Sequence, residues 1–136
     1  MKELHISKNK QKLNISFIHS FLTQSYWAQG RTVEQVEATI RNSVCYGLYI
    51  HDQQIGFARV LTDHAVFAYL MDVFMIEDQR GKGYAAQLMT FIMNDPELSG
   101  VSRWMLGTRD AHSLYRKFGF SEIPNPQWVM SLNKTI

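Results

Sequence analysis

Cysteine, proline and long apolar runs are all scarce in this 136-residue sequence. Cys45 is the single cysteine, so no disulfide can form within the chain, and a reducing, cytoplasmic location is expected. No apolar run reaches the roughly 20 residues that span a bilayer, and residues 1–5 lack a signal-peptide core, so no membrane association is expected. The five histidines are scattered without the spacing of metal ligands, and no metal site is predicted.

A strong charge of one sign is also missing. The 14 Lys and Arg residues face 12 Asp and Glu residues, which gives a net charge of +2 with neutral histidines. Because no dense basic stripe occurs, nucleic acid is not an expected partner, whereas a small anionic ligand is compatible with this charge. The hydrophobic content of 46% indicates a folded core, and no repeat or linker divides residues 1–136, which we interpret as one domain. The sequence leaves a homodimer possible.

What is present is an alternation of strand and helix patterns. Asn14 or Ser16 is expected to cap a first helix, and Thr32 with Gln35 forms a capping box that starts a second. A further helix is predicted at 84–93. Strands are predicted at 4–7, 44–51, 55–61, 66–76 and 102–107, and together these elements indicate an α+β fold around a mixed sheet.

The end of the sequence is predicted to form a short helix and a hairpin. Asp110 is the expected cap of that helix, and Gly119 is a suitable residue to end it. Residues 120–123 and 128–132 then have the composition of two strands, although two prolines lie between them.

A basic turn with two glycines joins the third long strand to the following helix. The first amides of a helix have no partner within the helix, and the helix dipole adds partial positive charge there. Gly81 and Gly83 lack the Cβ that would hold a ligand away from the backbone, and Arg80 and Lys82 add full positive charges. The turn therefore predicts a binding site for a diphosphate.

Two other phosphate-binding motifs fit less well. Gly81, Gly83 and Ala86 match a degenerate dinucleotide fingerprint, but four polar residues, 77–80, separate the strand from the first glycine. Too little chain follows for the second half of a dinucleotide-binding fold. The Gly-x-x-x-x-Gly-Lys-Ser/Thr motif of nucleotide triphosphatases does not occur in the sequence.

Two motifs in the sequence resemble those of the GNAT family of N-acetyltransferases. Residues 80–85, Arg-Gly-Lys-Gly-Tyr-Ala, resemble the family's Arg/Gln-x-x-Gly-x-Gly/Ala signature. Residues 114–120, Leu-Tyr-Arg-Lys-Phe-Gly-Phe, resemble its Leu-Tyr-x-x-x-Gly-Phe element, and the similarity extends loosely from Ile6 to the end of the sequence. The resemblance implies a mainly antiparallel central sheet with helices on both faces (α/β/α) and acetyl-coenzyme A (acetyl-CoA) as the co-substrate.

The resemblance also implies which residues hold that co-substrate. The backbone of Val73, Phe74 and Met75 would pair with the pantetheine arm, on a strand that carries a bulge in the family. Thr108 stands where many members have asparagine and could donate one hydrogen bond; His112 either faces the co-substrate or lies on the surface. The turn residues would hold the diphosphate: Arg80, Gly81, Lys82, Gly83, Tyr84, Ala85 and Ala86.

Tyr115 is the expected general acid and a further co-substrate contact. A departing thiolate needs a proton, and because a thiol has a pKa near 8.5 and a phenol one near 10, a neutral phenol can donate at pH 7. In the family a tyrosine at this position has that role. The alternative is ordinary core packing, which is common for a tyrosine on a short amphipathic helix.

Asp72 is a carboxylate within the apolar run 68–76. A buried charge without a partner costs several kcal/mol, so this position predicts a partner, a cleft or a distorted strand. One interpretation is a structural hydrogen bond to a neighbouring loop. The other is a base, direct or through water, for the attacking amine, whose ammonium form has a pKa near 10.

Tyr26 and Trp27 end the first predicted helix, and Arg31 follows them closely. In the family this region covers the acceptor site, so these residues either hold a small polar acceptor or pack a helix junction.

These observations predict an acetyl-CoA-dependent N-acetyltransferase. The acceptor would be an amine of a small molecule or peptide that attacks the bound thioester directly in a ternary complex. The alternatives are a catalytically silent coenzyme A-binding module and a transferase of a longer acyl group.

Overall fold

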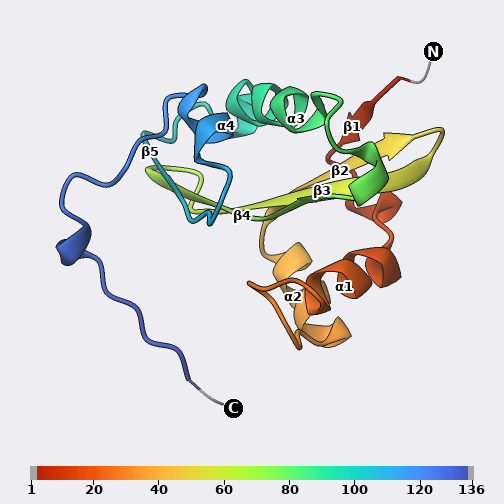
Figure 1. Cartoon of the computed structure of the whole chain (residues 1–136), viewed down its shortest axis with the longest axis horizontal. Helices are drawn as coiled ribbons and strands as arrows, with labels where there is room; N and C mark the ends of the chain where they lie inside the picture. The colour runs from red at the N-terminus through yellow and green to blue at the C-terminus, as the bar shows by residue number, and fades with distance from the viewer. Residues whose placement is uncertain (1–2, 135–136) are drawn as a thin grey trace.

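The computed structural model describes residues 3–134, which form a five-stranded sheet with helices on both faces (Figure 1). The strands are β1 (His5–Ser7), β2 (Val44–Ile50), β3 (Gln53–Thr62), β4 (Phe67–Met75) and β5 (Arg103–Leu106). The helices are α1 (Ile15–Thr23), α2 (Val33–Arg41), α3 (Tyr84–Met93) and α4 (His112–Arg116). Short 3-10 helices occupy Lys10–Lys12, Glu77–Gln79, Pro96–Leu98 and Pro126–Trp128. Within residues 3–134, no helix has the length and apolar character to cross a membrane.

The strands follow the order β1-β2-β3-β4-β5, and every neighbouring pair is antiparallel except β4 and β5, which are parallel. Helices α1 and α2 cover one face, and α3 and α4 cover the other (Figure 1). Each face has its own buried cluster: Leu88 and Ile92 belong to the one beneath α3, and Ile18, Leu22 and Val36 to the one beneath α1 and α2. This arrangement confirms the expected α+β fold with a mixed, mainly antiparallel sheet and helices on both faces.

The starts of α1 and α2 follow the predicted capping signals. The side chain of Asn14 accepts a hydrogen bond from the amide of Phe17, so Asn14 rather than Ser16 caps α1. Thr32 and Gln35 form the predicted capping box of α2, in which each side chain bonds the backbone of the other residue.

The predicted end of α1 is wrong by about one turn, the length of a few residues. The helix ends at Thr23, and Trp27 lies in the connection to α2. The hydroxyl of Ser25 donates to the carbonyl of Leu22 and accepts from the amide of Ala28. These bonds offer the backbone an alternative to the helical pattern, which ends the helix early.

The predicted cap of α4 is also wrong. Ala111 occupies the cap position and makes no side-chain capping bond. The hydroxyl of Thr108 instead accepts a hydrogen bond from the amide of Ala111 at 3.0 Å, so the chain turns around Thr108 and leaves Asp110 exposed. The predicted end is confirmed, because Gly119 has a φ of 94°, a left-handed conformation that suits glycine.

The predicted C-terminal hairpin is wrong, because neither 120–123 nor 128–132 forms a strand. Residues 121–134 extend away from the body of the protein (Figure 1), and all of them except Asn125 are exposed or nearly so. The composition of these segments is typical of strands, but strand formation also requires a partner backbone. Within residues 3–134 the segments meet none, and the intervening prolines restrict φ and remove N–H donors.

A β-bulge divides β4 into two halves. The pairing with β3 shifts between Phe57 and Arg59, and Asp72 has a left-handed φ of 54°. Leu70 packs in the cluster beneath α3, whereas Phe74, an even number of residues later, packs beneath α1 and α2. In a regular strand these two side chains would share a face, so the bulge redirects every side chain that follows it.

Candidate active site

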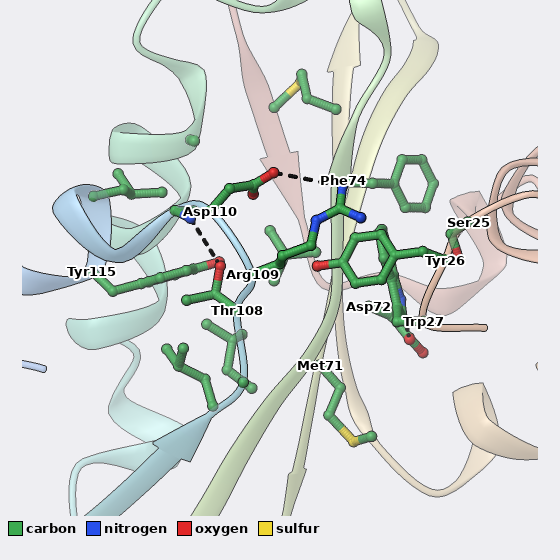
Figure 2. A pocket seen from close by; sticks show the side chains of 18 of the residues that line it. Ser25, Tyr26, Trp27, Met71, Asp72, Phe74, Thr108, Arg109, Asp110 and Tyr115 are labelled. Atoms are coloured by element: carbon green, nitrogen blue, oxygen red, sulfur yellow. Dashed lines mark hydrogen bonds and ion pairs between the residues drawn. The ribbon is translucent and has the colours of Figure 1, made fainter. Parts of the chain in front are cut away.

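A cleft opens where β4 and β5 part. Phe67 lies opposite Arg103 and Leu70 opposite Leu106, after which β5 ends while β4 continues. The cavity has a volume of ≈ 1150 Å³ and is lined by the second half of β4, the α1–α2 connection, the β5–α4 connection and the first part of α3 (Figure 2). The cleft brings together these predicted site residues: Asp72, Val73, Phe74, Met75, Arg80, Ala85, Thr108 and Tyr115.

The glycine turn borders this cleft and leads into α3. Gly81 and Gly83 have φ values of 76° and 80°, a conformation that other residues rarely adopt. A Cβ added at either glycine would meet no atom within 4 Å, so the space in front of the turn is open. Helix α3 begins without a side-chain cap, and the amides of residues 84–86 have no partner within the helix. The turn is therefore an open site for an anion.

The two basic side chains of the turn are held beside this site. The Nε of Arg80 donates to the carbonyl of Met75 at 3.0 Å, which ties the turn to the end of β4. The Nζ of Lys82 donates to the side chain of Gln79 at 3.0 Å and stays exposed. Both charges thus flank the open amides.

The second half of β4 directs backbone groups into the cleft. The amide of Ile76 donates to the carbonyl of Ile55 on β3 at 2.9 Å. Because backbone groups alternate between the two edges of a strand, those of Met75 and Val73 point away from β3, toward the cleft. The carbonyl of Met75 is held by the turn, whereas Val73 has no β5 residue opposite it. An extended ligand can therefore pair with this edge like an added strand.

Tyr115 reaches into the cleft from α4 (Figure 2). The residue is 8% exposed, and its ring packs edge-on against Phe120 with centroids 6.1 Å apart. The dashed line near it in Figure 2 joins the amide of Ala111 to the hydroxyl of Thr108, and no side-chain hydrogen bond within residues 3–134 involves the Tyr115 hydroxyl. Burial, together with the nearby Tyr26, raises the pKa of Tyr115 above its ordinary value, so the phenol stays protonated at neutral pH. The fixed ring thus presents a neutral donor to the cleft.

Asp72 lies on the β4 side of the cleft and is fully engaged by other residues. Its Oδ2 accepts hydrogen bonds from Arg59 at 2.9 Å and from Arg31 at 2.7 Å, and its Oδ1 accepts one from Trp27 at 3.0 Å. The carboxylate is 1% exposed. These are the contacts that the structural interpretation of Asp72 expects, and its role as a base stays a prediction.

One known protein family matches the part of the sequence that forms this site. Residues 41–122 match the family model of the acetyltransferase (GNAT) domain. The match covers more than half of the 136 residues and includes β4, the glycine turn and Tyr115. The chain belongs to the GNAT acetyltransferase family.

Three individual proteins that are similar to this chain are also assigned as acetyltransferases. A crystal structure from Xanthomonas campestris pv. campestris, assigned as a GNAT acetyltransferase, is 39% identical with a TM-score of 0.93, over 98% of this chain and 95% of that one. A protein of Gibberella zeae, also assigned as an acetyltransferase, is 27% identical over 82% of this chain and 75% of its own length. A Clostridium acetobutylicum protein, assigned as an acetyltransferase and solved with acetyl-CoA, is 16% identical over 98% of this chain and 96% of that one; its TM-score of 0.70 shows a shared fold.

Thr108 and His112, the two other predicted contacts of the co-substrate, lie in different surroundings. Thr108 lines the cleft, and because its hydroxyl oxygen accepts from the amide of Ala111, the hydroxyl proton remains available to a ligand. His112 is exposed at the start of α4 and does not line the cleft. Both contacts stay predictions.

Neither a reactive thiolate nor a cluster of metal ligands is found among the residues that the structure describes. Cys45 is 1% exposed, and burial raises the pKa of its thiol to about 11, so little thiolate forms near neutral pH. Within residues 3–134, no group of three or more His, Cys, Asp or Glu side chains is arranged to hold a metal ion.

Sequence reasoning missed Arg109. Its guanidinium lies 3.9 Å from the centre of the Tyr26 ring, and Tyr26 packs edge-on against Trp27 with centroids 5.0 Å apart. The β5–α4 connection thereby contacts the α1–α2 connection across the cleft (Figure 2). An exposed arginine in a loop leaves no periodic pattern, so the sequence carries no signal for this contact. Trp27 and Arg31 both donate hydrogen bonds to Asp72. This arrangement agrees with the alternative in which these residues pack a helix junction and do not hold the acceptor.

Proposed function

We propose that this GNAT protein is an acetyl-CoA-dependent N-acetyltransferase that acts on a primary amine of a small molecule or peptide. The observation that carries the proposal is the shape of the cleft. An anion site of free amides borders it, an unpaired strand edge runs along it, and a buried tyrosine hydroxyl faces into it. Acetyl-CoA has a diphosphate, an extended amide-containing arm and a thioester in this order. Its presence in the Clostridium acetobutylicum protein of the same fold supports the choice.

The chain would bind the diphosphate through the amides of residues 81–86. Gly81 and Gly83 keep the backbone in the conformation that leaves these amides open, and Arg80 and Lys82 add positive charge nearby. Hydrogen bonds between backbone N–H groups and phosphate oxygens are charge-assisted, and the positive end of α3 strengthens them.

The edge of β4 would orient the pantetheine arm and the acyl carbon. The cleft-facing backbone groups of Val73 and Met75 can pair with the amides of the arm. Acetyl-CoA supplies a thioester, whose carbonyl oxygen gains negative charge as an amine attacks. A backbone N–H aimed at this oxygen, with that of Val73 as the candidate, would stabilise the charge.

Tyr115 would complete the transfer. As the amine nitrogen bonds to the carbonyl carbon and the carbon–sulfur bond breaks, the hydroxyl of Tyr115 gives its proton to the sulfur. The amine loses a proton to solvent, and Tyr115 regains one from solvent. The raised pKa of Tyr115 keeps the donor protonated between turnovers.

The binding half of the proposal is tested with Gly83→Asp. This variant places a negative carboxylate, and a side chain that disfavours φ of 80°, at the anion site. We expect calorimetry to show no measurable binding of coenzyme A. Gly30→Asp is the matched control, because Gly30 also has a left-handed φ, of 81°, and open space around it but lies outside the turn, and this variant should bind normally. Unchanged affinity in Gly83→Asp would contradict the assignment.

The catalytic half is tested by thiol release. The wild-type protein is incubated with acetyl-CoA and a panel of amines, polyamines, amino acids and peptides. Amine-dependent release identifies the acceptor class. A second set of reactions replaces acetyl-CoA with thioesters of longer acyl groups. Release from these alone would favour transfer of a longer acyl group, and binding of coenzyme A without release in either set would favour a silent binding module.

A further inference from the structure

One part of the cleft is not needed for the co-substrate of the proposed function. The diphosphate is assigned to the glycine turn and the pantetheine arm to the second half of β4. Tyr26 on the α1–α2 connection, Tyr69 and Met71 on the first half of β4, and Arg109 on the β5–α4 connection line the cleft but belong to neither region. We call the part that they line the acceptor end. Because the cavity of ≈ 1150 Å³ also has to hold the pantetheine arm, the acceptor end has room for a small molecule.

The guanidinium of Arg109 is held at the acceptor end with its N–H donors free. It lies 3.9 Å from the centre of the Tyr26 ring, a contact that uses its flat face and leaves the donors in its plane available. Within residues 3–134, no side-chain hydrogen bond involves this guanidinium. Its ion pair with Asp110 has an N–O distance of 3.7 Å, longer than a hydrogen bond, and the Arg109 side chain is 65% exposed. A ligand can therefore bind these donors without breaking a protein hydrogen bond.

The charged side chains around the acceptor end carry an excess of one positive charge. Arg31 and Arg59 share the single carboxylate of Asp72, and Arg109 pairs with Asp110. Three guanidinium groups thus accompany two carboxylates. The carboxylate of Asp72 is 1% exposed and already accepts three hydrogen bonds from side chains, so it offers little to an ammonium group. This balance opposes a polyamine and favours an acceptor that carries an anionic group.

We propose that Arg109 binds a carboxylate of the acceptor, and that the acceptor is a small amine with a carboxylate beside its amino group, as in an α-amino acid. The inference rests on the proposed acyl transfer and adds the class of its acceptor. The planar fork of a guanidinium matches both oxygens of a carboxylate. Arg109 and Tyr115 line the same cavity, and Figure 2 shows Arg109 between Tyr115 and Tyr26. A carboxylate anchored there would keep the neighbouring amino group in the cavity that holds the thioester; the acetyl group moves to the nitrogen, and the carboxylate stays unchanged.

Pairs of acceptors that differ only in the carboxylate test the proposal by thiol release. Each common α-amino acid is compared with the amine that lacks its carboxylate, such as leucine with 3-methylbutylamine and phenylalanine with 2-phenylethylamine, at equal concentrations of unprotonated amine. We expect kcat/KM for the preferred amino acid to exceed that for its amine by roughly 10²-fold, the scale of a charge-assisted contact. Arg109→Gln should remove this preference by lowering kcat/KM for the amino acid alone, and Arg109→Lys should restore part of it. Arg103→Gln is the control, because Arg103 is exposed on β5 outside the cleft.

Calorimetry provides a second measurement that does not depend on turnover. The preferred amino acid, titrated into protein saturated with coenzyme A, should bind to the wild type and to Arg103→Gln but at least tenfold more weakly to Arg109→Gln. The affinity for coenzyme A itself should be the same in all three; weaker binding in Arg109→Gln would assign Arg109 to a phosphate of the co-substrate and overturn the proposal. Thiol release from amines without a preference for the carboxylate would overturn the proposal and leave acyl transfer standing. Release with no acceptor at all would contradict acyl transfer and this inference together.

Discussion

The two sides of the cleft each carry one buried ionisable residue, and the two have opposite surroundings. Tyr115, on the α4 side, is 8% exposed, and its hydroxyl makes no side-chain hydrogen bond within residues 3–134; the nearby bond joins Ala111 to Thr108. Asp72, on the β4 side, is 5% exposed and accepts three hydrogen bonds from side chains. Burial alone therefore does not identify a catalytic group. Tyr115 can give a proton to a ligand without losing a protein contact, whereas Asp72 would have to release a partner.

The backbone at Asp72 explains why its carboxylate is held so firmly. A non-glycine residue with φ of 54° is strained, by roughly 1 kcal/mol or more, and persists only where its surroundings fix it. Arg59 reaches Asp72 from β3, and Arg31 and Trp27 reach it from the α1–α2 connection. These contacts hold the bulge, and the bulge aims the backbone of Val73 at the cleft. We therefore infer that Asp72 is a positioning residue for the strand edge.

Breaking the Asp72 network should have the largest effect. In Arg59→Met the carboxylate stays buried but loses a guanidinium partner, and removal of one member of a buried ion pair costs roughly 3–5 kcal/mol. Urea denaturation should show a fall of this size in the free energy of unfolding. Arg41→Met is the control, because Arg41 is exposed on α2 and its change should stay within about 0.5 kcal/mol. An equally stable Arg59→Met would show that the network contributes little.

Removing the Tyr115 hydroxyl should leave the fold intact and slow the chemistry. Tyr115→Phe keeps the ring and its packing, so unfolding and coenzyme A affinity should match the wild type. The chemical step should slow by roughly 10²-fold or more. The defect should shrink for a thioester whose thiol has a lower pKa, because that thiolate departs without a proton. Because the pKa of Tyr115 is raised, the wild-type donor should also persist as pH rises toward 10, with activity lost only above that range.

Tyr49→Phe is the matched control for Tyr115→Phe. Tyr49 is 3% exposed, and its hydroxyl is buried without a hydrogen-bond partner, but it lies outside the cleft. Its removal should leave turnover unchanged. If Tyr115→Phe turned over at the wild-type rate while chemistry limits, Tyr115 would be a core residue and the catalytic half of the proposal would fail.

The pH profile of Asp72→Asn separates positioning from base catalysis. Asparagine keeps the shape but removes the charge that holds Arg59 and Arg31, so we expect turnover to fall by roughly tenfold, the effect of about 1.4 kcal/mol. If Asp72 positions the edge, the defect should be the same at every pH at which the variant stays folded. If Asp72 is the base, the defect should shrink as pH rises toward the pKa of the amine, where free amine forms unaided. Circular dichroism at each pH confirms folding.

The local signals in the sequence predicted most of the fold. The capping box at Thr32, the cap at Asn14 and the glycine turn are set by neighbours in the chain, so the sequence identifies them. The segment 128–132 has a strand pattern but no strand structure, because pairing depends on a distant partner. The partners of Asp72 come from two separate parts of the chain, the α1–α2 connection and β3, and only the fold brings them together with β4. The sequence indicated that this carboxylate needs a partner, but not which one.

The smallest effect concerns Arg109 and Tyr26, which join the two sides of the cleft. A cation over an aromatic ring at an exposed site contributes about 0.5–1 kcal/mol. A double-mutant cycle of Arg109→Gln and Tyr26→Leu should therefore give a coupling of this size in the free energy of unfolding. The control cycle of Arg103→Gln and Tyr26→Leu should give no coupling, because Arg103 lies on β5 away from Tyr26. A coupling near zero in the first cycle would mean that the two sides of the cleft are held independently. The difference between Tyr115 and Asp72 would then arise within each side alone.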